Sequence, residues 1–144
     1  MKKTVPQKDR KLTPQEYRTI LKTVQLKELH VSSCAAKLRK DKLGEQLKIF
    51  IEDSVHHLPS HEDALEVNIK YTLHATATTK RDYALKLECS YQLKYESVDP
   101  LPTEFVEIFL DVNLKLNTWP YFREYVQNMV SRMNLPPLTL DLLR

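Results

Sequence analysis

Alternation of apolar and polar residues dominates the middle of the chain. Residues 65–73 and 83–95 place an apolar or aromatic side chain at every second position, with mostly polar or charged residues between them. Successive side chains of a strand point to opposite faces of a sheet. The pattern therefore predicts strands with one buried face and one solvated face, as in an antiparallel sheet.

Two earlier segments alternate less clearly. Residues 47–52 carry Leu47, Ile49 and Ile51, and residues 29–35 carry Leu29, Val31, Ser33 and Ala35 on one side. Turns are expected at 37–44 and 80–82, and a loop at 56–63. These connections are too short for crossover helices, which favours antiparallel pairing. We expect a four-stranded meander or Greek-key sheet.

A capping box predicts a helix before the sheet. Thr13 and Glu16 are three residues apart, so each side chain can bond the other's backbone N–H, and Pro14 suits the first helical position. The helix is expected over residues 14–24. Its apolar stripe consists of Tyr17, Ile20, Leu21 and Val24.

Two helical stripes follow the sheet. Residues 103–112 carry an apolar stripe at helical spacing, which residues 114–116 interrupt. A second, longer helix is expected from Asn117 or Thr118. Pro120 is tolerated in the first turn of that helix. Asn134 readily takes the left-handed conformation, so it is expected to end the helix together with Pro136.

The predicted fold class is α+β: a four-stranded antiparallel sheet with one face covered by a long C-terminal helix, plus a short N-terminal helix. Residues 1–12 are expected to form a basic mobile arm, and residues 13–144 a single domain. The arm holds five of the 22 Lys and Arg residues and one acidic residue, so the rest of the chain is close to neutral. A basic nucleic-acid groove is therefore not indicated.

Composition excludes several function classes. The only glycine is Gly44, so neither a phosphate-binding loop, a dinucleotide-binding loop nor a nucleophile elbow can be built. No apolar run approaches the length of a membrane span. Cys34 and Cys89 form no CxxC motif and suit a reducing compartment, so we expect a cytoplasmic protein without membrane insertion.

Catalytic and metal-binding patterns are also missing. His56, His57 and His61 are the one metal-like cluster, but Leu65 stands where an HExxH motif needs its second histidine. No nucleophile has a base at motif spacing. We expect no enzyme activity, no cofactor and no metal. The surplus of apolar side chains indicates either a partner surface or a tail that closes the core.

Residues 117–140 resemble a known family. Asn117-Thr118-Trp119-Pro120-Tyr121-Phe122-Arg123-Glu124, then Met129-Val130-Ser131-Arg132, then Leu135-Pro136-Pro137-Leu138-Thr139-Leu140 are similar in order and spacing to the signature helix and tail of the SecB protein-export chaperones. The similarity covers about two dozen residues.

The resemblance implies an ATP-independent holdase that binds unfolded polypeptides. It also implies a dimer of dimers (a homotetramer), with helices sandwiched between two sheets. By the same analogy, Leu135, Leu138 and Leu140 line a client-binding groove, and Trp119 and Tyr121 add aromatic surface. Clients are expected to bind through apolar side chains and through strand addition at a sheet edge.

This sequence departs from the family pattern in its net charge and in its N-terminal helix. Export chaperones of this kind are acidic and dock on the SecA motor, whereas this chain has a pI of about 8.8, which argues against SecA coupling. The N-terminal helix is an addition to the family's pattern. The family includes chaperones dedicated to one antitoxin, so a dedicated client and a non-chaperone adaptor are the alternatives to general export.

Overall fold

The computed structural model describes residues 12–59, 63–138 and 140. Its helices and strands are α1 (Pro14–Leu21), β1 (Val24–Leu38), β2 (Lys48–Pro59), β3 (Ala64–Thr76), β4 (Leu85–Ser97), α2 (Thr103–Asp111) and α3 (Asn113–Arg132). Short 3-10 turns lie at Lys40–Lys42 (η2) and Lys80–Asp82 (η3). The predicted α+β class, with a short N-terminal helix and a long C-terminal helical segment, is confirmed.

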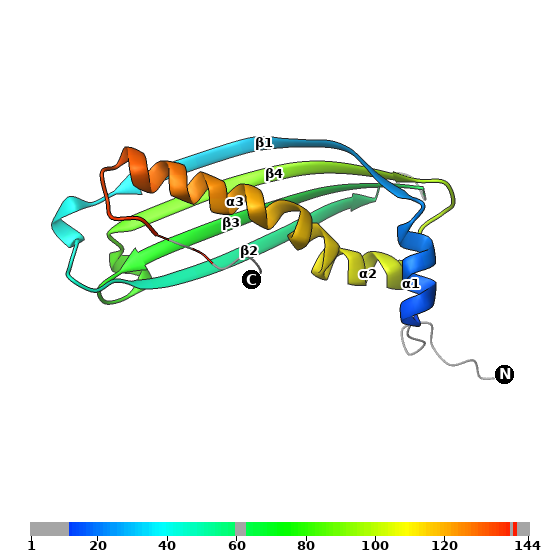
Figure 1. The fold of residues 1–144 in the computed structure, drawn as a ribbon, viewed down its shortest axis with the longest axis horizontal. Helices are drawn as coiled ribbons and strands as arrows, with labels where there is room; N and C mark the ends of the chain where they lie inside the picture. The colour runs from blue at the N-terminus through cyan, green and yellow to red at the C-terminus, as the bar shows by residue number, and fades with distance from the viewer. Residues whose placement is uncertain (1–11, 60–62, 139, 141–144) are drawn as a thin grey trace.

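The four strands form one antiparallel sheet in the order β1-β4-β3-β2. Strands β2, β3 and β4 are consecutive neighbours, whereas β1 pairs with β4 and its connection to β2 crosses the end of the sheet. This is the Greek-key alternative of the two predicted topologies. Helices α2 and α3 run diagonally over one face of the sheet, and α1 stands at one end beside α2 (Figure 1).

The core lies between the sheet and α3. Burial alternates along β3 and β4 as the sequence predicts, with the apolar side chains facing the helices. Tyr71 is fully buried at the centre, its ring 5.0 Å from that of Phe122 and 5.5 Å from that of Trp119, measured between centroids. Its hydroxyl is 2.8 Å from that of Thr118.

Strand β1 does not keep a simple period of two. The register with β4 shifts between Leu26 and Glu28 and again between Val31 and Ser33. After the second shift, Cys34 and Ala36 lie on the helix side, whereas Ser33 and Ala35 lie on the solvent side. The predicted single phase for residues 29–35 is wrong in its second half, because a β-bulge moves the following side chains to the other face.

The loop starts later in the structure than the predicted range of 56–63. Strand β2 continues to Pro59, and His56 and His57 pair with Asn68 and Val67 of β3. Pairing with the long strand β3 extends β2 beyond its local pattern. His61, the third member of the histidine cluster, lies outside the described residues.

The helix boundaries differ from those expected. Helix α1 ends at Leu21, and β1 already begins at Val24. Helices α2 and α3 are separated only at Val112, not at 114–116, so Pro120 lies inside α3 rather than in its first turn. Leu114 is fully buried in the core, which favours helix there despite the local pattern.

Two features are absent from the described part of the chain. None of its helices is long and apolar enough to span a membrane. None of its His, Cys, Asp and Glu side chains form a group of three or more that could hold a metal ion. Residues 1–11 of the predicted arm lie outside the described residues.

Candidate functional site

The chain reverses direction at the end of α3. Asn134 has a φ of 59° and is the one non-glycine residue with positive φ in the described chain. The N–H of Leu135 bonds to the carbonyl of Val130, and that of Asn134 to the carbonyl of Ser131. These two bonds form a Schellman motif, and the predicted left-handed stop at Asn134 is confirmed.

The tail then runs back over the molecule as an extended segment. Pro136 and Pro137 cannot continue a helix and hold the backbone extended. Leu140 is buried, with 9% of its surface exposed, and its carbonyl accepts a hydrogen bond from Nε of Arg123 at 3.2 Å. The tail is thus held at both ends, at Asn134 and at Leu140.

An open hollow of about 370 Å³ lies beside this tail, and we call it the tail groove. Four parts of the chain line it: the β1–β2 connection, the ends of three strands, the last turn of α3 and the tail. The lining residues are Leu43, Gly44, Glu45, Leu47, Ile49, Ala75, Leu85, Val130, Leu135, Pro136, Pro137 and Leu138.

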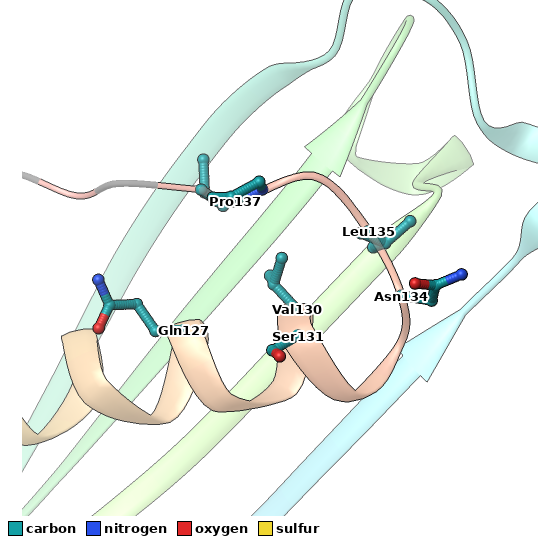
Figure 2. A pocket seen from close by; sticks show the side chains of 7 residues that line it. Gln127, Val130, Ser131, Asn134, Leu135 and Pro137 are labelled. Carbon is teal, nitrogen blue, oxygen red and sulfur yellow. The ribbon is translucent and has the colours of Figure 1, made fainter.

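A second hollow of about 320 Å³ lies between the tail and α3. Gln127 and Val130 from the helix and Pro137 from the tail line it, with Asn134 and Leu135 on the turn between them (Figure 2). It shares four lining residues with the tail groove: Val130, Leu135, Pro137 and Leu138. The tail therefore forms a wall of both hollows.

The tail groove is suited to apolar side chains. Glu45 is its one charged lining residue. The lining offers aliphatic side chains and proline rings, with no nucleophile next to a general base. Such a hollow removes an apolar side chain from water, which is favourable by about 25 cal/mol for each Å² buried.

The structure brings together some of the predicted binding residues. Leu135 and Leu138 both line the tail groove, and Leu140 anchors the end of the same tail. Tyr121 is 52% exposed but lies on α3 near Tyr91, away from the groove lining. Trp119 is 3% exposed and packs in the core, so it offers no surface in this structure.

The residues opposite the tail were not predicted as part of a binding site. Leu43 lies in the segment that we expected to be only a charged turn, and Leu47 and Ile49 were expected only as residues of a strand. Leu43 and Ile49 are 39% and 37% exposed, high values for such large apolar side chains. The apolar Leu43 within that charged segment was the available signal.

Strand β1 presents further apolar surface, the β1 face, on the helix side of the sheet. Its residues are Leu26, Leu29, Val31, Cys34 and Ala36, which pair with buried residues of β4. Leu26 and Val31 are 44% and 52% exposed. Helix α3 reaches β1 through Tyr125, whose hydroxyl donates a hydrogen bond to the carbonyl of Ala35 at 3.0 Å.

The chain is similar to a solved chaperone structure. A SecB-like chaperone of Mycobacterium tuberculosis, solved in complex with a ChAD peptide from the HigA1 antitoxin, superimposes with a TM-score of 0.68 at 20% identity. The match covers 88% of this chain and 92% of that one. A Streptococcus agalactiae protein of unknown function matches with a TM-score of only 0.43 at 11% identity, over 82% of this chain and 96% of that one.

No protein-family model matches the chain, and no curated protein matches it. The structural likeness extends over nearly the whole of both chains, and it agrees with the resemblance in residues 117–140. At 20% identity it establishes the architecture. The chain has the fold of a SecB-like chaperone.

Proposed function

We propose that this chain belongs to the SecB family and acts as an ATP-independent holdase chaperone. It binds unfolded or partly folded polypeptides, whose apolar side chains enter the tail groove. The observation that carries the proposal is the groove itself: an open, mainly apolar hollow walled by the tail segment with the SecB-like pattern. Folded proteins bury their large apolar side chains, so this site favours unfolded chains.

Backbone pairing adds a second mode of binding. Strands β1 and β2 are the two edges of the sheet, and β1 spans 15 residues. An extended client segment can pair with such an edge through main-chain hydrogen bonds, while alternate side chains reach apolar surface. On β1 that surface is the β1 face.

A dedicated client is the first alternative to general export. The similar M. tuberculosis chaperone was solved with a peptide from an antitoxin, which supports a peptide-binding role and a dedicated antitoxin client for this chain. Export through SecA is less well supported, because the pI of about 8.8 differs from the acidic family pattern. A non-chaperone adaptor that reuses the fold is the second alternative.

Charged substitution in the groove tests the proposal. Leu138→Asp places a carboxylate where a client's apolar side chain would bind, and burying an unpaired charge is costly. We expect Leu138→Asp to abolish suppression of aggregation of a chemically denatured protein, measured by light scattering. Val98→Asp is the matched control, since Val98 is 79% exposed and outside the groove. Full suppression by a folded Leu138→Asp variant would refute the groove as the binding site.

Client range separates the alternatives. A general holdase suppresses aggregation of several unrelated denatured proteins at similar molar ratios. A dedicated chaperone or an adaptor fails with most of them, but one partner encoded beside it loses stability or solubility when this chain is removed. Pull-down of that partner with wild type and with Leu138→Asp then shows whether it uses the tail groove.

We further propose a homo-oligomer, a dimer of dimers in the pattern of the family. Ile108, Val112 and Leu116 are each between 36% and 47% exposed and are four residues apart. On consecutive helical turns this spacing forms one apolar stripe, here the α2–α3 stripe. An exposed apolar stripe of this kind is suited to contact with a second copy.

A further inference from the structure

Cys34 and Cys89 are 55 positions apart in the sequence but lie directly opposite each other in the sheet, as partners in the β1–β4 register. Opposed residues of antiparallel strands have Cα atoms about 4.5–5.5 Å apart. Disulfides form when the Cα atoms are about 4.4–6.8 Å apart. The backbone therefore already holds these two residues at a disulfide separation.

Both thiols face the same side of the sheet, and their environments differ. Cys34 is exposed, whereas Cys89 is 2% exposed. Burial raises the pKa of the Cys89 thiol, and the Cys34 thiol raises it further, against the hydrogen bond with Tyr91, which lowers it. The Tyr125 side chain contacts the Cys34 thiol. The Cys34 thiol is thus exposed to solution, whereas the Cys89 thiol is buried beside it.

We infer that Cys34 and Cys89 form an intramolecular disulfide when the protein meets a small-molecule disulfide oxidant. With oxidised glutathione, the Cys34 thiolate attacks one glutathione sulfur, the glutathione S–S bond breaks, and one glutathione thiolate leaves. Cys89 then gives up its proton, and its sulfur attacks that of Cys34 and releases the second glutathione thiolate. Two protein thiols are oxidised, and one glutathione disulfide is reduced to two thiols that take up the two protons.

The bond would constrain an edge strand of the sheet. Among the described residues, β1 pairs with β4 alone, and most of its side chains are exposed. A disulfide between Cys34 and Cys89 ties the middle of β1 covalently to β4. Local opening of β1 is then suppressed, and the edge and the β1 face are kept in one conformation.

The test uses the full chain in glutathione buffers of graded potential. Thiols are alkylated under denaturing conditions, and intact masses are measured. Wild type is expected to lose two alkylation sites and about 2 Da, without bound glutathione and without a covalent dimer. Cys89→Ser is expected to retain one glutathione on Cys34, and Cys34→Ser to stay unmodified, because Cys89 is buried. Cys89→Ala serves if the serine variant does not fold.

Hydrogen exchange and thermal unfolding give the structural readout. Oxidised wild type is expected to exchange more slowly in β1 and to melt about 5 °C or more above the reduced form, since the bond closes a long loop. Neither change is expected in Cys34→Ser treated in the same way. Retention of glutathione by wild type, a purely intermolecular disulfide, or no oxidation in a strongly oxidising buffer would each overturn the inference.

Discussion

The hydroxyl pair of Tyr71 and Thr118 shows how the core accommodates polar atoms. Thr118 donates its one hydroxyl proton to the carbonyl of Leu114 at 2.8 Å, so Tyr71 is the donor in the 2.8 Å contact between the two hydroxyls. Both side chains are fully buried. A buried hydroxyl without a partner is costly, which makes this contact a determinant of how α3 sits on the sheet.

Removal of this hydrogen bond is expected to destabilise the fold. Tyr71→Phe and Thr118→Val should each lower the free energy of unfolding by about 1 kcal/mol, because each variant removes this hydrogen bond from the core. Urea unfolding of both single variants and the double variant measures the coupling. The double variant should lose less than the sum of the two single losses. Simple additivity would show that the two hydroxyls do not stabilise each other.

His74 predicts a pH dependence of stability. Burial is the main cause that lowers the pKa of His74 from 6.5, and the Lys86 cation lowers it further. Glu52 raises the pKa, Lys80 lowers it to a smaller extent, and Glu88 has the smallest, raising, effect. The unfolded chain therefore binds this proton at a higher pH than the folded chain does. Stability is full above pH 6.5 and falls as the pH falls from there toward the lower folded-state pKa.

Urea midpoints at pH 7.5 and pH 5 test this dependence. His74→Gln should reduce the loss of stability between the two pH values relative to wild type, since the neutral side chain cannot take up the proton. His30→Gln, at an exposed position of β1, is the matched control and should keep the wild-type difference. An unchanged difference in His74→Gln would refute this role of His74.

At the scale of elements, α1 is a short helix that depends on its cap. Thr13 accepts from the N–H of Glu16, and the Glu16 carboxylate accepts from the N–H of Thr13. The predicted capping box is confirmed. The helix contacts α2 through Tyr17, whose ring stacks on Phe105 with centroids 4.8 Å apart. Ile20 and Leu21 also pack against the core, and a helix of only eight residues needs both this packing and its cap.

Loss of the cap is expected to loosen α1 and leave the sheet intact. Thr13→Ala should destabilise α1 by about 1 kcal/mol, seen as faster amide exchange in residues 14–21 with unchanged exchange in β3 and β4. Thr19→Ala, at an exposed position inside α1, controls for the loss of a threonine. Equal exchange in the two variants would show that the capping box does not stabilise the helix.

Local sequence patterns are sufficient to predict which face a side chain occupies in the central strands, but not in the edge strand β1. Strands β3 and β4 are each paired on both sides, so their side-chain phase agrees with the alternation read from the sequence. Edge strand β1 contains two register shifts, which no local pattern indicated. The phase of an edge strand is set by its partner and by the surface it reaches, and a bulge costs less where one side is unpaired.

For the whole molecule, the oligomeric state depends on surfaces that one copy leaves uncovered. The double variant Ile108→Asp/Leu116→Asp places two carboxylates on the α2–α3 stripe. We expect a lower mass by light scattering coupled to gel filtration, because an interface does not bury unpaired charges without cost. Val98→Asp should keep the wild-type mass. A monomeric wild type, or a double variant of unchanged mass, would refute the stripe as an interface.

Local sequence determined the features that depend on neighbouring residues. The alternation of β3 and β4, the capping box of α1 and the left-handed turn at Asn134 are all set by side-chain periodicity or by the conformational preference of one residue. The prediction that the tail leucines belong to a groove-forming segment was implied by the resemblance to SecB chaperones. These features were predictable because their energies arise within a few residues of one another.

Tertiary structure alone decided which distant segments meet. The tail groove exists because the Greek-key crossover brings Leu43 and Leu47 opposite a tail more than 80 positions later, and Trp119 is buried because α3 lies across Tyr71. The same long-range pairing places Cys34 against Cys89. Such contacts depend on the order of the strands and the path of the crossover, and the burial that stabilises them has no period along the chain.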